Sequence, residues 1–187
     1  MEIKNVINAQ SGNLISIASI TDNDSTPVIS VTSSGSSEGN NVKINGSLSN
    51  PSDEAITFEY STFDDIAVAP DDYTAIALQS MEVAAGQTSF EINITTVDDN
   101  IMEGTEVFDI NFQNLQFAEF SNDSAQLSFQ AKIIDNDGKP QITIEDVSGT
   151  EGGDLTFEIV VSNPASSAVR LKYATADNTA LAPGDYT

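Results

Sequence analysis

Apolar and polar residues alternate in short runs along most of the chain, and turn residues separate these runs. In residues 42–48, for example, Val42, Ile44 and Leu48 share one phase while polar residues occupy the other. Alternation with a period of two is typical of a strand with one buried face, and no window keeps the 3.6-residue period of a helix. Seven strands are therefore predicted, at residues 28–33, 42–48, 56–62, 76–83, 90–94, 106–112 and 127–134.

The number and spacing of these runs predict the fold class. Seven alternating strands in roughly 110 residues are typical of an all-β, immunoglobulin-like antiparallel two-sheet β-sandwich. The chain has no Trp and no Cys, so the tryptophan and disulfide of antibody domains are missing. The chain is therefore expected to share the architecture of immunoglobulin domains without their hallmark residues.

A long internal repeat sets the predicted domain organisation. The sequence Asp-Asn-Asp occurs at residues 22–24 and again 113 residues later, at 135–137. Placing the first 74 residues over the last 74 needs no gap and matches about a third of the positions. Such a period exceeds the ~20–50 residues of solenoid units, so it indicates a tandem array of domains. The expected units are the C-terminal strand or strands of a preceding repeat (1–24), a complete domain (25–137) and the truncated N-terminal half of a following repeat (138–187).

Composition narrows the function classes. The chain carries 29 acidic against 6 basic residues, a net charge of −23, which argues against binding nucleic acid or anionic lipid. The absence of Cys and His excludes disulfides, thiolate or imidazole zinc sites, and Ser-His or Cys-His nucleophile pairs. No run approaches the ~18 apolar residues of a membrane span, so membrane insertion by this fragment is not expected. The N-terminus also lacks the apolar stretch of a signal peptide.

Strand order predicts that many of the acids meet. In a succession of antiparallel strands, alternate loops lie at the same end of the sandwich as the C-terminus of the last strand. The loops of that end carry Glu38, Asp64, Asp65, Asp98, Asp99 and Glu103, and the last strand ends at residues 135–137. The loops at 50–54, 84–86 and 115–124, at the opposite end, are poorer in acids. Glu106 shares its strand phase with Phe108 and is expected to point inward just beneath the acidic end.

Converging carboxylates call for a counter-charge, because they cannot all remain ionised side by side. Oxygen ligands without His or Cys select Ca²⁺ or Mg²⁺, and many carboxylates on loops suit Ca²⁺, which takes 6–8 oxygens. More than one ion, with bridging carboxylates, is the expectation. The stretch from residue 135 is not an EF-hand loop, since its fifth position is not acidic and its sixth is not Gly. Gly-rich calcium β-roll repeats are missing as well.

A set of short motifs resembles the Calx-β domain. The motifs are Glu-Gly at 38–39, Tyr-Ser-Thr-x-Asp at 60–64, Ala-x-x-Asp-Tyr at 69–73, Val-Asp-Asp-Asn-x-x-Glu-x-x-Glu-x-Phe at 97–108 and Ile-Ile-Asp-Asn-Asp at 133–137. This family of modules occurs in the regulatory region of sodium–calcium exchangers, in an integrin β-subunit tail and in arrays within large surface proteins. The resemblance covers the complete unit and both partial ones.

The resemblance implies a calcium ligand set. The matching positions are Glu38, Asp64, Asp98, Asp99, the Ile101 carbonyl, Glu103, Asp135, Asn136 and Asp137. The chain departs from the family pattern at Asn100 and Asn136, where acids are common, and at Asp71, where Gly is usual. Fewer or weaker ions would follow from these changes. Asp72 and Tyr73 are interpreted differently, with Asp72 holding a turn and Tyr73 packing against the sandwich.

Each acid alone has a simpler interpretation as a turn cap or a solvated loop residue, so the prediction rests on the group. The predicted function is a non-enzymatic, calcium-binding repeat of a secreted or cell-surface multidomain protein. Its ions would stiffen an array for adhesion or cell communication. The alternatives are a regulatory calcium sensor of a membrane transporter, a structural spacer with a weak site, and a metal-dependent hydrolase. The hydrolase lacks an obvious base and a phosphate-holding cation near the acids.

The predicted partners are calcium, neighbouring repeats of the same chain and an unidentified adhesion partner. A monomer is expected, with a dimer as the alternative if residues 1–24 of one molecule complete residues 138–187 of another. Since residues 22–24 lack the rest of their own domain, we expect this earlier Asp-Asn-Asp copy to bind calcium poorly.

Overall fold

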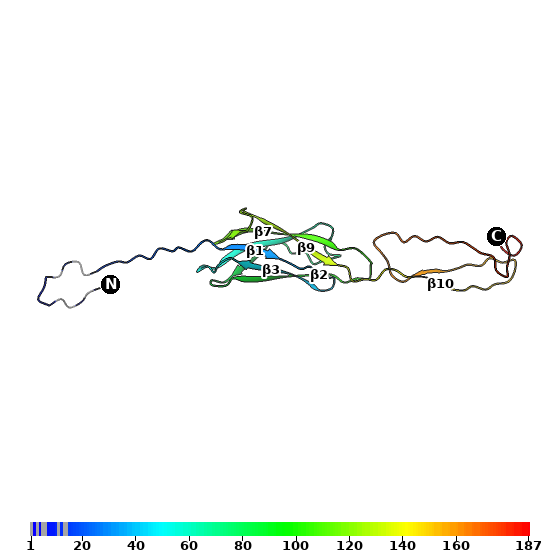
Figure 1. Cartoon of the computed structure of the whole chain (residues 1–187), viewed down its shortest axis with the longest axis horizontal. Helices are drawn as coiled ribbons and strands as arrows, with labels where there is room; N and C mark the ends of the chain where they lie inside the picture. The colour runs from blue at the N-terminus through cyan, green and yellow to red at the C-terminus, as the bar shows by residue number, and fades with distance from the viewer. Residues whose placement is uncertain (1, 3, 5–6, 11, 13–14) are drawn as a thin grey trace.

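The centre of the molecule is a two-sheet β-sandwich (Figure 1). The computed structural model describes residues 2, 4, 7–10, 12 and 15–187, and this part of the chain contains strands but no helix. Nothing in the described residues therefore forms a helix that could cross a membrane. The all-β, immunoglobulin-like sandwich predicted from the alternation is confirmed.

One sheet has five strands and the other has four. In order across the larger sheet these are β2 (Ser36–Ser37), β9 (Leu127–Ile134), β7 (Glu106–Gln116), β4 (Ile56–Asp64) and β5 (Gln79–Val83). The smaller sheet runs β6 (Ser89–Thr95), β3 (Asn41–Leu48), β1 (Val28–Thr32) and β8 (Glu119–Phe120). Most neighbours are antiparallel, as expected. The short β2 and β8 instead add parallel pairs with β9 and β1, which the sequence pattern did not predict.

Alternate residues of the strands form the core between the sheets. In β3 every second residue is buried, and β4 and β7 contribute aromatic side chains to the same core. The ring of Phe58 lies 5.9 Å from that of Phe112 and 4.9 Å from that of Phe90. Tyr73, from the β4–β5 loop, is fully buried and stacks on Phe108 at 4.3 Å. Packing of this kind fixes the ends of the strands, and through them the loops.

The first strand passes from one sheet to the other within a few residues. Strand β1 ends one residue earlier than predicted, and β2 then pairs with the end of β9, with Ser36 opposite Ile133. Gly35 lies between the two strands with a φ of 73°, a backbone conformation that favours glycine. The crossing places Glu38 beside the end of β9, where its backbone N–H donates to the Ile134 carbonyl at 3.1 Å.

Two other strand boundaries differ from the prediction. Strand β5 begins at Gln79 instead of residue 76. Ile76 lies in the loop before β5, where its N–H donates to Thr62 Oγ1 and its carbonyl accepts from Thr62 N–H. Strand β7 continues to Gln116, beyond the predicted end at 112, where apolar alternation weakens but pairing with β4 persists.

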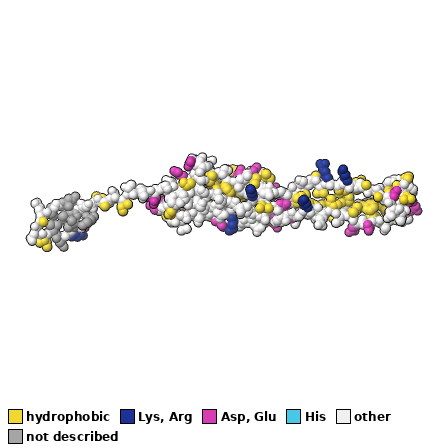
Figure 2. Space-filling model, viewed as in Figure 1, with side chains coloured by type: hydrophobic (Ala, Val, Ile, Leu, Met, Phe, Trp, Pro, Cys, Tyr) yellow, Lys and Arg dark blue, Asp and Glu magenta, His cyan; other side chains and the backbone are white. Residues whose placement is uncertain are grey.

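Residues 138–187 repeat the start of the sandwich. Strands β10 (Ile142–Ile144) and β11 (Ile159–Val161) pair with Ile142 opposite Val161, the register in which Ile29 faces Leu48 in β1 and β3. Apolar side chains of this segment remain exposed, as Figure 2 shows towards the C-terminal end. Tyr173, the repeat counterpart of buried Tyr60, is 89% exposed. The three predicted unit boundaries, 1–24, 25–137 and 138–187, remain a prediction.

The predicted strand within residues 1–24 falls partly outside the described residues. Among those described, Glu2 and Ile15 form an isolated antiparallel bridge, and residues 16–24 belong to none of the strands β1 to β11. The described residues after Ile15 run as an extended segment into the sandwich (Figure 1).

The core makes a direct stability prediction. Replacing Phe112, which is fully buried, with Ala should lower the free energy of unfolding by about 3–5 kcal/mol, because it removes a ring and leaves a cavity. The matched control is Phe63→Ala on β4, where the ring is 51% exposed and the loss should be well under about 1 kcal/mol. Urea unfolding monitored by circular dichroism measures both. Equal losses for the two variants would contradict the assigned core.

Candidate metal centre

Four chain segments meet at one end of the sandwich, which we call the acidic end. They are the β2–β3 loop, the β4–β5 loop, the β6–β7 loop and the segment after β9. Backbone hydrogen bonds tie them together: Gly39 N–H donates to the Val97 carbonyl at 3.3 Å, and Val97 N–H donates to the Asp72 carbonyl at 2.9 Å. The side chains of this end are therefore carried on loops fixed to one another.

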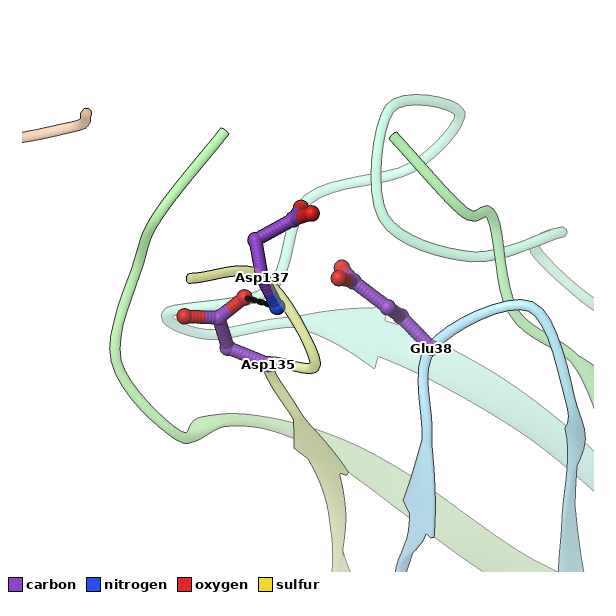
Figure 3. A group of neighbouring side chains, drawn as sticks. All are labelled: Glu38, Asp135 and Asp137. Carbon is purple, nitrogen blue, oxygen red and sulfur yellow. Dashed lines mark hydrogen bonds between the residues drawn. The ribbon is translucent and has the colours of Figure 1, made fainter. Parts of the chain in front are cut away.

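A first group of carboxylates consists of Glu38, Asp135 and Asp137. One oxygen of each lies within 4.8 Å of the others, and Figure 3 shows the three side chains meeting between the β2–β3 loop and the end of β9. Backbone amides hold the group: Asn136 N–H donates to Glu38 Oε1 at 3.3 Å, and Asp137 N–H donates to Asp135 Oδ1 at 2.9 Å. Asp137 Oδ2 is buried and has no hydrogen-bond partner among the described residues. A buried, unpaired carboxylate oxygen is the kind of atom that a cation would satisfy.

A second group lies beside the first and comprises Asp72, Glu103 and Glu106, again with oxygens within 4.8 Å of one another. Asp135 links the groups, because its Oδ2 accepts a hydrogen bond from Glu103 N–H at 2.9 Å. Burial, reinforced by Asp72 and Glu103, raises the pKa of Glu106 to about 7. The inward position expected for Glu106 from its strand phase agrees with this environment.

Two members of these groups, Asp72 and Glu106, are not in the ligand set predicted from the sequence. Asp72 was interpreted there as a turn residue. It does hold a turn, as expected, since its Oδ2 accepts a hydrogen bond from Val68 N–H at 2.6 Å. Its carboxylate also faces Glu106 and Glu103 across the loops. The repeated Asp-Tyr-Thr motif at 72–74 and 185–187 was the available signal, but it did not separate a turn from a ligand.

Asp64 belongs to neither group, although the family resemblance placed it in the ligand set. Its Oδ1 accepts hydrogen bonds from Ala69 N–H at 3.0 Å and from Tyr73 Oη–H at 2.7 Å, and these bonds lower its pKa. Burial and the same carboxylate raise the pKa of Tyr73 to about 12. The structure therefore shows Asp64 holding the β4–β5 loop on the core, and a ligand role for it remains a prediction.

The remaining predicted ligands lie around the two groups. Asn136 Nδ2 donates to Asp98 Oδ1 at 3.1 Å, and Ile101 N–H donates to Asp99 Oδ1 at 2.7 Å. Gly39, with a φ of 73°, lies so close to Asp98 that an added Cβ would be 2.8 Å from the Asp98 Cβ. Glycine at this position allows the two loops to approach.

The electrostatics of the acidic end favour a cation. Burial raises the pKa values of Glu38, Glu103 and Asp137, and their acidic neighbours raise them further. The ion pairs of the described residues join Lys4 to Glu2 and Lys43 to Glu91, so neither neutralises this end. Carboxylate, amide and carbonyl oxygens without nitrogen or sulfur ligands fit a hard divalent ion such as Ca²⁺.

The β6–β7 loop also contacts the repeat that follows. Met102 N–H donates to the Pro164 carbonyl and Ser166 N–H donates to the Met102 carbonyl, both at 3.1 Å. Asn163 Nδ2 lies 3.5 Å from the Asn100 carbonyl that it faces. Because this loop carries Asp99 and Glu103 as well, the candidate metal centre and the contact between repeats share one segment.

The chain matches a known family in sequence pattern and resembles solved structures in fold. A family model described as the Calx-beta domain matches residues 22–139 and again residues 135–187. No curated protein sequence matches the chain.

Two solved structures of Calx domains resemble the chain in fold. The apo form of the Calx CBD1 domain is 17% identical with a TM-score of 0.51, and the match covers 60% of this chain and 100% of that one. For CBD12 from CALX1.2 the identity is 17% and the TM-score 0.50, over 59% of this chain and 46% of that one. At these identities the likeness shows the fold alone.

The raised carboxylate pKa values predict how stability depends on pH without metal. The pKa of Glu106 is about 7 in the folded chain against an ordinary 4.5, so between these values the folded state binds a proton that the unfolded state does not. The metal-free chain should therefore gain stability as the pH falls from 7 towards 4.5 and lose it as the pH rises through 7.

Melting temperatures in a chelator, measured across this interval, test that expectation. Glu106→Gln should weaken the dependence, whereas Glu82→Gln, at an exposed position of β5, should leave it as in the parent chain. A parent melting temperature that falls steadily as the solution is acidified towards pH 4.5 would contradict the assignment.

Proposed function

This chain belongs to the Calx-beta domain family, and on that premise we propose that it is a non-enzymatic calcium-binding repeat whose ions stabilise the joint between successive domains. The family is one of calcium-binding β-sandwich domains. The setting that we propose is a secreted or cell-surface multidomain protein, in which a stiffened array supports adhesion or cell communication.

The observation that carries the proposal is the convergence of Glu38, Asp135 and Asp137 around a buried carboxylate oxygen that lacks a partner. Surface acids placed for solubility would point away from one another, whereas backbone amides hold these together. Holding like charges this close costs free energy unless a counter-ion or protons compensate. A divalent cation with oxygen ligands supplies the compensation at neutral pH.

The acidic residues would form two ion positions. Glu38, Asp135 and Asp137 would form one ion position, and Glu103, Glu106 and Asp72 a second, with Asp135 close to both. Asp98, Asp99, Asn136 and the Ile101 carbonyl supply further oxygens at the rim, which supports more than one ion per complete domain. Asp64 would act chiefly by holding its loop in place.

The stiffening follows from the shared β6–β7 loop. This loop carries ligands at Asp99 and Glu103, and between them Met102 bonds to the backbone of the next repeat. Without a counter-charge, repulsion among the acids favours opening of the loops and loosens that contact. With the charge compensated, the loop, the linker after β9 and the following repeat are held in one arrangement.

Calorimetric titration of calcium into the chain tests the proposal. We expect heat of binding and a rise in unfolding free energy of about 2.7 kcal/mol per site at a hundredfold excess of calcium over Kd. Asp98→Ala/Asp99→Ala should weaken binding strongly. The matched control, Asp53→Ala/Glu54→Ala, removes two adjacent exposed acids at the opposite end and should leave it unchanged. A parent chain without heat and without a melting shift would refute the function.

The measured affinity also separates the two settings. A regulatory sensor of a membrane transporter, the alternative setting, needs a Kd in the ~10⁻⁷–10⁻⁵ M range. An extracellular repeat needs only about 10⁻⁴–10⁻³ M. We expect the weaker range. A sub-micromolar Kd would favour the sensor, and a structural spacer would bind more weakly than either.

A further inference from the structure

The turn at residues 162–166, which contacts Met102, is held by hydrogen bonds of its own side chains. Asn163 Nδ2 donates to the carbonyls of Gly138, at 2.9 Å, and Pro164, at 3.3 Å. Ser162 Oγ–H donates to Asn163 Oδ1 at 2.7 Å and fixes the orientation of the amide. The backbone of residues 164–166 is thus presented to the metal-binding loop by a preformed turn, and Met102 pairs with Ala165 as an isolated parallel bridge.

The complete domain carries the same turn at its opposite end, 113 residues earlier. Asn50 Nδ2 donates to the carbonyls of Ser25, at 2.9 Å, and Pro51, at 3.4 Å. Ser49 Oγ–H donates to Asn50 Oδ1 at 2.7 Å, as in the later copy. The scaffold that holds Met102 in one repeat is therefore present in full in the other.

A hollow of about 530 Å³ lies at this earlier turn, between residues 22–27, 50–54 and 117–119. Shifted by 113 positions, its first two segments correspond to 135–140 and 163–167, which include the turn that Met102 contacts. The rim carries Phe117, an aromatic side chain that is 59% exposed and has a φ of 63°. Phe117 thus gives the hollow an exposed apolar edge.

We propose that this hollow is the docking surface for the metal-binding loop of an upstream Calx-beta domain. The upstream residue at the position of Met102 would donate its N–H to the Pro51 carbonyl and accept from Asp53 N–H, as Met102 does with Pro164 and Ser166. This inference rests on the tandem part of the proposed function. It does not rest on calcium binding by the complete domain.

The earlier turn carries two acidic residues where the later turn carries two serines. Asp53 and Glu54 stand where the later turn has Ser166 and Ser167. These two acids would face the acidic loop of the upstream domain. Docking at this hollow therefore suits an upstream loop whose charge is compensated, and it should be stronger in calcium than in a chelator.

Disulfide trapping tests the docking directly, because the protein contains no cysteine. The test protein is an extended chain in which residues 1–137 are followed by residues 25–187, so that one more unit is inserted in register. Met102→Cys in the first unit and Ser52→Cys in the second place two thiols at the predicted bridge, the repeat equivalent of Met102 and Ala165.

The same extended chain provides both controls. The reference pair is Met102→Cys in the second unit with Ala165→Cys, which traps the contact already seen. The mismatched pair joins Met102→Cys of the first unit to Asp123→Cys in the β8–β9 loop of the second. In calcium, the Ser52 pair should oxidise at least about tenfold faster than the mismatched pair, because docking raises the effective thiol concentration.

The outcomes decide the inference separately from the proposed function. Oxidation of the Ser52 pair no faster than the mismatched pair, both in the parent background and with Asp53→Ser/Glu54→Ser, would overturn the docking surface whether or not calorimetry shows calcium binding. Failure of the reference pair would overturn it as well, since the contact on which it is patterned would be absent. With Asp53→Ser/Glu54→Ser, rapid trapping should persist in a chelator, and this result would support docking even where calcium does not bind.

Discussion

Repulsion among carboxylates that cannot move apart is the constraint on which the rest of this structure depends. Backbone amides fix Glu38 and Asp135 at the acidic end, and the core fixes the strands that carry these amides. The side chains can therefore relieve their repulsion only by taking up protons or a cation. The pKa of about 7 for Glu106 reflects proton uptake, and the proposed oxygen-only ligand set would allow uptake of a cation.

The same constraint connects the metal centre to the architecture of the array. The loop between β6 and β7 carries acids on either side of Met102, and the backbone of Met102 lies against the next repeat. In the proposed function, a change in charge at the acids would act on the contact between repeats through a few residues of backbone. Several exposed apolar side chains of residues 138–187, among them Phe157 at 53%, occupy positions equivalent to core positions of the complete domain.

The sequence was sufficient to predict the features that depend on local periodicity. Alternation predicted the buried phase of β3 and the inward direction of Glu106, and strand order predicted which loops share an end. Contacts between residues far apart in the sequence could not be predicted in this way. The hydrogen bond from Tyr73 to Asp64, the grouping of Asp72 with Glu106, and the passage of the first strand between sheets depend on three-dimensional packing. The position of Met102 on the following repeat likewise has no local signature.

Diffraction from calcium-grown crystals, collected to record anomalous scattering, tests the central claim most directly. The account predicts a peak at the acidic end with carboxylate oxygens of Glu38, Asp135 and Asp137 at roughly 2.3–2.6 Å, the usual calcium–oxygen distance. A second peak is expected near Glu103 and Glu106. A map without a peak at this end, with the three carboxylates turned apart into solvent, would contradict the account.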